Sequence, residues 1–139
     1  MNVETRYIQF HVKKDEIRDI TDQVAKELSD TGMQDGTVTV FCPGSTGGLS
    51  TVEYEPGLVE TDIPKLLEKL APEKDDYAHH FTWHDYNGYG HVRAFLIGPS
   101  ITIPFVKGRL TLGTWQQVIF LNMDDKSRSR RLVLQFMGT

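Results

Sequence analysis

Apolar and polar residues alternate over residues 3–12, which predicts a β-strand because side chains of an extended chain point to opposite faces with a period of two. The period then changes to three and four. The apolar positions with this spacing fall on one stripe of a helix: Ile17, Ile20, Val24 and Leu28. Asp19 or Thr21 can cap this helix if it begins late, and Gly32 suits its end.

The middle of the chain repeats the order of strand and helix. Runs of β-forming residues at 37–42 and 49–54 predict two strands, and the residues between them form a loop rich in glycine and hydroxyl groups. The apolar spacing from Val59 to Leu70 predicts a second amphipathic helix. Residues 73–90 show little periodicity and are interpreted as a long loop.

The last third of the chain is predominantly β after one more helix. Asn87 can cap a short helix over residues 88–97. The four strands predicted after it are 100–106, 109–112, 114–123 and 130–137. Strand 114–123 is largely apolar on both faces, so we expect the core to continue into a partner subunit.

This order predicts one α+β domain over residues 1–139, a mostly antiparallel sheet or sandwich with two to three helices packed on it. The length of 139 residues fits a single domain that needs no disulfide, and the one cysteine, Cys42, excludes a Cys-rich zinc knuckle. No apolar run approaches the ~20 residues of a membrane span, and the N-terminus has no signal-peptide core, so we expect a cytoplasmic protein without a membrane partner.

The net charge of −4 disfavours a nucleic-acid partner, because phosphate backbones need basic surfaces. The charge is unevenly distributed, however. Residues 107–139 hold six Lys and Arg against two Asp and Glu, a net charge of +4, which leaves −8 for the rest of the chain. A local anion site is therefore the more fitting expectation for this basic end.

Histidine is the unusual residue type, because four of the five histidines fall within thirteen positions: His79, His80, His84 and His91. Imidazole nitrogens suit a divalent metal such as zinc, and a catalytic site would need about three protein ligands. No fixed ligand motif is present, so a polar loop with surface histidines is an equally simple explanation.

Two further groups of residues are suited to an anionic substrate. Ser45 and Thr46 lie in the glycine-rich loop, whose backbone amides can bind an anion, although the spacing is not that of a P-loop. Arg128 and Arg130 are two apart, so on a strand they share a face and can clamp phosphate or carboxylate. The alternative for both groups is an ordinary connection and a solvated edge strand.

A pair of carboxylates, Glu53 and Asp62, lies nine residues apart. Carboxylates can act as general bases or metal ligands. The alternative for Asp62 is a favourable charge near a helix N-terminus.

These features occur together in a familiar order. The segment Ser100–Gln116 combines alternating aliphatic residues, a glycine turn and a final Gly-Thr-Trp-Gln. The chain also contains His79, the Asn87-x-x-x-His91 spacing, Arg128-x-Arg130, and Glu53 followed by Asp62. With these features together, it resembles the YjbQ-like family over nearly its whole length. This family is also called the secondary thiamine-phosphate synthase family.

The resemblance implies a homotrimer of α+β subunits with a side activity as a thiamine-phosphate synthase, a transferase that joins a pyrimidine diphosphate to a thiazole phosphate. In this interpretation His79 and His91 bind a divalent metal, zinc or magnesium, and His91, Glu53 and Asp62 are catalytic. The expected ligands of a small phosphorylated molecule are Ser45, Thr46, Asn87, Arg128 and Arg130. The alternative is a non-catalytic homotrimer that binds a ligand or metal.

One departure from the family pattern bears on the metal. The family usually has His-Thr-Thr or His-Thr-Ser where this chain has Gly44-Ser45-Thr46, which indicates a divergent branch. A metal site here would have fewer protein ligands, or would use another residue such as His84 or Glu53.

Overall fold

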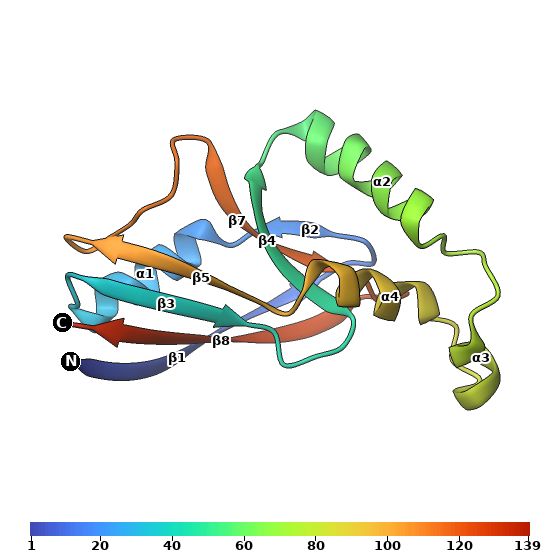
Figure 1. Cartoon of the computed structure of the whole chain (residues 1–139), viewed down its shortest axis with the longest axis horizontal. Helices are drawn as coiled ribbons and strands as arrows, with labels where there is room; N and C mark the ends of the chain where they lie inside the picture. The colour runs from blue at the N-terminus through green and yellow to red at the C-terminus, as the bar shows by residue number, and fades with distance from the viewer.

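The computed structural model describes the whole chain, residues 1–139, and its strands form two antiparallel sheets (Figure 1). The five-stranded sheet has the order β1 (Asn2–Val12), β8 (Arg128–Gly138), β3 (Gly36–Phe41), β5 (Ser100–Val106) and β6 (Arg109–Leu110). The three-stranded sheet has the order β2 (Ile17–Asp19), β7 (Gln116–Asn122) and β4 (Gly47–Glu53). The predicted α+β class with antiparallel sheets is confirmed.

The helices are more numerous than the two to three predicted. They are α1 (Thr21–Thr31), α2 (Ile63–Leu70), which follows the π-helical turn η1 (Gly57–Asp62), α3 (Ala78–Trp83) and α4 (Gly88–Ile97). The prediction for α4 is confirmed, whereas α3 lies inside the stretch interpreted as a long loop. Six residues are too few to show a period, which is why the polar and aromatic sequence of α3 concealed it.

The first helix begins late, at Thr21, because the residues before it form a strand. Residues 17–19 pair with β7 as β2, so Ile17 belongs to a sheet and not to the helical stripe. A carboxylate oxygen of Asp19 accepts hydrogen bonds from the Thr21 amide at 3.0 Å and the Thr21 hydroxyl at 2.6 Å. Asp19 thus binds the first residue of α1, whereas Ile20, directly before the helix, makes no side-chain capping bond.

Two apolar clusters form the core, one on each face of the three-stranded sheet. The larger cluster lies between the two sheets and α1, and includes Leu28, Leu49, Phe120, Leu132 and Phe136. The smaller cluster lies between the three-stranded sheet and helices α2 and α4, and includes Leu67, Ala94, Ile119, Leu121 and Met123. The three-stranded sheet is therefore the middle layer of the molecule.

This layering explains the two apolar faces of β7. Val118 and Phe120 pack into the larger cluster, and Ile119 and Leu121 into the smaller one. The chain itself covers both faces, so the inference that β7 needs a partner subunit was wrong. Alternation along a strand shows that both faces are buried, but not what buries them.

The register of the sheets brings two loops together. Gly47, at the start of β4, pairs with Asn122, at the end of β7. The loop 42–46 that precedes β4 therefore lies beside the turn 123–127 that follows β7. Figure 1 shows α3 at one end of the molecule beyond α4, with both chain termini at the other end. No helix is both long and apolar enough to cross a membrane.

Candidate functional site

An arginine-lined pocket of about 450 Å³ opens where these two loops meet. Its walls are the β3–β4 loop, residues 42–46, and the start of β8, residues 128–131. The two walls are more than 80 residues apart in sequence and are joined only by the sheets. We call this cavity the arginine pocket.

Arg130 is the central cation of the arginine pocket. Its Nη2 atom donates hydrogen bonds to Asn122 Oδ1 at 2.7 Å, to Thr46 Oγ1 at 3.2 Å and to the Thr46 carbonyl at 3.3 Å. The guanidinium lies over the ring of Phe120 at 5.4 Å. Arg130 occupies the same face of β8 as buried Leu132 and Leu134, so its side chain extends the row of core residues toward the pocket.

The charge of Arg130 is only partly compensated. Its Nε atom is buried without a hydrogen-bond partner. Burial lowers the pKa of Arg130, and its three hydrogen bonds are to neutral oxygens. None of the chain's ion pairs includes Arg130 or Arg131. A partly buried guanidinium in this state is prepared to bind an anion.

Glycine and threonine in the β3–β4 loop shape the other wall. A Cβ atom at Gly44 would lie 3.3 Å from Arg130 Nη1, so the glycine leaves space beside the guanidinium. Thr46 is buried and bonded to Arg130, whereas Ser45 is exposed at the pocket wall. The structure therefore brings the predicted residues Ser45, Thr46 and Arg130 together with Arg128.

Behind the arginine pocket lies Asp124, a fully buried carboxylate. It accepts hydrogen bonds from Arg128 Nε, from Asn87 Nδ2 at 3.2 Å and from the Asp125 amide at 2.8 Å. Burial alone would raise the pKa of Asp124, but the hydrogen bonds from Asp125, Arg128 and Asn87 outweigh it and lower the pKa to about 2. The Asp124 carboxylate is therefore ionised at neutral pH, and it pairs with Arg128, one of the two predicted arginines.

Asn87 connects this carboxylate to the histidines. Because its Nδ2 atom donates to Asp124, its Oδ1 atom accepts from the Nε2–H of His79, at 3.1 Å. Asn87 precedes α4 as predicted, but its side chain makes no capping bond. A continuous chain of contacts thus runs from Arg128 through Asp124 and Asn87 to His79.

His79 and His91 face each other, with ring centroids 4.6 Å apart and planes tilted by 54°. The contact to Asn87 places a proton on Nε2 of His79, so its Nδ1 atom is the free one. Burial and the neighbouring His79 lower the pKa of His91, against the opposing charges of Asp124 and Asp85. His91 is therefore neutral at pH 7 and can accept a proton.

The other histidines have structural roles or none. His80 Nε2 accepts a hydrogen bond from the Gly88 amide at 3.1 Å, and its ring contacts those of Tyr77 and Tyr86. His84 ends α3 with a positive φ of 54°. His11 lies exposed on β1.

A metal site is not complete within one chain. No three His, Cys, Asp or Glu side chains come together in an arrangement that could hold a metal ion. The adjacent imidazoles of His79 and His91 supply two nitrogens, and one nitrogen of His79 is engaged with Asn87. This donor set does not match the three-ligand site of a catalytic zinc. The expectation of a divalent metal stays a prediction.

The two carboxylates of the predicted catalytic set lie elsewhere in the chain. Glu53 ends β4 opposite Gln116, six residues beyond Gly47 and therefore roughly 20 Å from the arginine pocket. Asp62 ends the turn η1 and is exposed. Glu55, and not Asp62, accepts the free amides that open this helical segment, those of Gly57 at 2.6 Å and Leu58 at 3.0 Å. A single subunit does not bring Glu53 to the arginines.

Sequence reasoning missed Asp124 and Asn122, the residues that hold Arg128 and Arg130 in place. Their only signals in the sequence were ordinary positions, Asn122 as the last residue of β7 and Asp124 in the polar turn after it. Neither the burial of Asp124 nor the contact of Asn122 with a residue eight positions away can be read from that signal.

A family model described as UPF0047 protein YjbQ-like matches residues 6–139. The chain belongs to this family. A UPF0047 protein of Archaeoglobus fulgidus is 41% identical over 123 residues, which are 88% of this chain and 92% of that protein. UPF0047 protein YugU of Bacillus subtilis is 30% identical over 126 residues, 91% and 92% of the two chains.

Solved structures of YjbQ-like proteins share the fold. A YbjQ-like protein of unknown function from Sulfolobus solfataricus has a TM-score of 0.89 at 26% identity, over 99% of this chain and 100% of that one. A hypothetical protein from Aeropyrum pernix has a TM-score of 0.85 at 34% identity, over 96% and 99%. The chain therefore shares both the sequence family and the fold of these proteins.

Proposed function

We propose that the arginine pocket binds the phosphate of a small phosphorylated molecule. The observation that carries this proposal is Arg130, a partly buried cation with an unpartnered Nε atom and no carboxylate in contact. Arg128, paired with Asp124, adds a second guanidinium to the same pocket, whereas Arg131 lines the pocket with its guanidinium over the ring of Tyr7. Phosphate oxygens match the planar fork of a guanidinium and supply the missing charge.

The neighbouring histidines supply the chemistry of an enzyme. His91 is the general base, since its pKa is lowered and its ring is free of hydrogen bonds to carboxylates, and His79 is oriented by Asn87. The link from Arg128 to His79 holds the arginine pocket and the histidines in a defined relation. The resemblance of the family suggests a transfer to a phosphorylated acceptor, as in thiamine-phosphate synthase.

The direct test of phosphate binding is isothermal titration with inorganic phosphate. Wild-type protein is compared with Arg130→Met and with the control Arg109→Gln, an exposed arginine on β6. Saturable binding that Arg130→Met abolishes and Arg109→Gln retains supports the proposal. Equal phosphate binding by Arg130→Met and wild-type protein would overturn it.

The test of catalysis is a thiamine-phosphate synthase assay on wild-type protein and His91→Ala, each with and without a chelator. Loss of activity in His91→Ala assigns the base. A loss with chelator supports the alternative in which His79 and His91 bind a divalent metal and His91 is a ligand, not the base. Equal activity in all four reactions would remove both from the mechanism.

A non-catalytic homotrimer that binds a phosphorylated ligand is the second candidate. The position of Glu53 favours it, because the arginine pocket of one chain contains no carboxylate base. Exposed apolar side chains on α3 and α4 supply a surface for assembly, including Phe81, Trp83 and Phe95 at 74%, 73% and 84% exposed. Sedimentation at micromolar concentration should show a trimer, and a species of 15.8 kDa alone would contradict it.

A further inference from the structure

The outer face of the five-stranded sheet is left uncovered by the rest of the chain. Its inner face carries the larger apolar cluster, to which α1 contributes Val24 and Leu28. Helices α2, α3 and α4 lie toward the other end of the molecule (Figure 1). The outward side chains of β1, β8, β3 and β5 therefore face solvent.

The strand register places twelve of these outward side chains in three rows, each of which crosses β1, β8, β3 and β5. Residues directly opposite each other in antiparallel strands lie on the same face of the sheet. Ten of the twelve are exposed, and Thr39 and Val133 are half-buried. We call the twelve together the uncharged face. Its rows are Val3, Met137, Thr37 and Pro104; Thr5, Gln135, Thr39 and Thr102; and Tyr7, Val133, Phe41 and Ser100.

The uncharged face contains no Asp, Glu, Lys, Arg or His. Charged residues are 24% of the chain, so twelve outward positions would ordinarily include about three. A sheet face that meets only water gains solubility from such charges. Depletion of charge at the centre of a surface, with charged residues at its rim, is instead typical of a protein interface. Here the rim includes His11 and Arg131, on the next outward positions of β1 and β8.

The polar side chains of the middle row are paired with one another. Gln135 Nε2 donates a hydrogen bond to Thr5 Oγ1 at 3.3 Å, and the hydroxyl oxygens of Thr39 and Thr102 are 3.4 Å apart. Burying polar groups costs less free energy when they already have hydrogen-bond partners. The middle row is therefore suited to being covered by another protein surface.

The two flanking rows supply exposed apolar surface. Val3 and Met137 are opposite each other in one row, and Tyr7 and Phe41 lie on either side of Val133 in the other. With strands about 4.8 Å apart and outward residues about 6.8 Å apart, twelve side chains cover roughly 400 Å² of the sheet plane. The accessible surface above that plane is larger. Together with the rim it approaches the about 800 Å² that each partner buries in a standard interface.

The absence of charge also indicates which partner fits. A nucleic acid needs several cations to neutralise its phosphates, and the uncharged face has none. An uncharged surface is complementary to an equally uncharged one, and a second copy of this chain supplies the same three rows. Two twisted sheets can pack face to face at about −30°, as the layers of a β-sandwich do.

We propose that the uncharged face binds the same face of a second copy of this chain, related by a two-fold axis. This contact is separate from the arginine pocket and from the α3–α4 surface of the proposed homotrimer, so it does not depend on either. A two-fold contact doubles whatever assembly the other surfaces make.

The test is sedimentation equilibrium of the full chain at micromolar concentration, with Gln135→Lys and Thr102→Lys as the two variants. Each replaces an exposed side chain of the middle row by a cation that the partner face cannot pair, so we expect half the wild-type mass. The control Ser29→Lys adds the same charge on the exposed side of α1 and should keep the wild-type mass. Circular dichroism and a thermal melt of each variant check that the chain is folded.

Wild-type mass in both folded variants would overturn the proposal, as would a wild-type protein that sediments only at 15.8 kDa. A fall to one third of the wild-type mass would also overturn it, because the face would then contact a different surface in a three-fold ring. A monomeric wild-type protein that binds a single-stranded oligonucleotide, with bases stacked on Tyr7 and Phe41, would identify the face as a nucleic-acid platform instead.

Discussion

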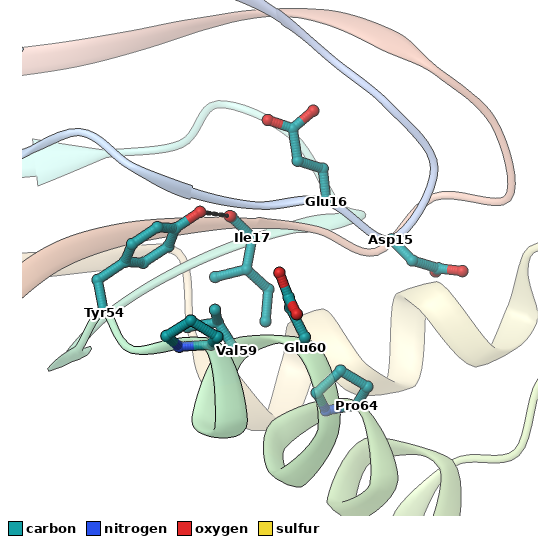
Figure 2. Close-up of a pocket in the computed structure, with 8 residues that line it drawn as sticks. Asp15, Glu16, Ile17, Tyr54, Val59, Glu60 and Pro64 are labelled. Carbon is teal, nitrogen blue, oxygen red and sulfur yellow. Dashed lines mark hydrogen bonds between the residues drawn. The ribbon is translucent and has the colours of Figure 1, made fainter.

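The arginine pocket and the cavities between β2 and the helical segment η1–α2 lie on opposite faces of the same three-stranded sheet and carry opposite charge. In the arginine pocket, Arg130 has no carboxylate partner. Beside β2, Glu60 has no cationic partner and Asp15 has only a distant one (Figure 2). Asn122 connects the two regions, because it lines the cavity that contains Leu67 and Leu121 and accepts a hydrogen bond from Arg130. A net charge of −4 therefore conceals two local surfaces of opposite sign.

The central carboxylates of the two regions have pKa values that are shifted in opposite directions. Asp124 is held as an anion by hydrogen bonds from Asp125, Arg128 and Asn87. Asp15, by contrast, has its pKa raised, chiefly by burial. The hydrogen bonds around Asp124 stabilise its charged form, whereas the surroundings of Asp15 make its charged form less favourable in the folded state. This difference indicates that Asp124 is a positioning residue, because its charge is part of the hydrogen-bonded structure around it.

The largest expected effect is on phosphate binding in Arg130→Met. Losing the charge-assisted hydrogen bonds of one guanidinium, worth about 1.5–3 kcal/mol each, should weaken phosphate binding about 100-fold, as titration calorimetry would show. A thermal melt like that of the wild-type protein would show that the loss of binding does not come from misfolding. Unchanged phosphate affinity in a folded Arg130→Met protein would contradict the role of Arg130.

The next effect is on stability in Asp124→Asn. The Asp124 pKa of about 2, against an ordinary 3.8, corresponds to about 2 kcal/mol of the free energy of unfolding. Because the folded-state pKa is lowered, this stabilisation is present above pH 4 and is lost as the pH falls toward 2. Urea unfolding at pH 7 and pH 3 should show a difference between wild type and variant that shrinks at the lower pH.

In the same urea measurement, Asp15→Asn should change the free energy of unfolding in the opposite direction. Its raised pKa means that the charged form disfavours folding, so the variant should be slightly more stable than wild type at pH 7 and lose that advantage in acid. A destabilised Asp15→Asn protein would contradict the contrast between the two carboxylates.

A smaller effect concerns the histidine pair. Burial lowers the pKa of His91 most and the neighbouring His79 lowers it further, so His79→Ala should raise the His91 pKa by removing the smaller of these two effects. The titration of the ring protons followed by NMR measures this directly. An unchanged His91 pKa would mean that the two rings do not interact electrostatically, despite their 4.6 Å separation.

The smallest effect is expected from Gly44→Ala. The added Cβ atom would lie 3.3 Å from Arg130 Nη1, which forces a shift of a few tenths of an ångström in a long side chain. Phosphate affinity should fall only a few-fold, with little change in thermal stability. A larger side chain at position 44 should weaken binding more, and equal affinity across such a series would show that the phosphate does not approach this side of Arg130.

Local patterns predicted most of the fold. The helix over 88–97 and the strand over 100–106 have the predicted bounds, and Arg128 and Arg130 do share one face of β8. The helix α3 and the short strand β2 were not predicted, because segments of six and three residues are too short to display a period. The same brevity makes them dependent on their neighbours for stability.

The sequence by itself determined the antiparallel α+β fold, the family, the row of arginines on β8 and the histidine-rich segment, since each is a matter of residue type and near spacing. Tertiary structure alone decided what those residues contact. It buried Asp124 behind the arginines, turned Asn87 from a helix cap into the link to His79, and placed Glu53 at the far end of β4. The physical reason is range: periodicity depends on residues a few positions apart, whereas Thr46 and Arg130 are 84 positions apart and meet only because two sheets bring their loops together.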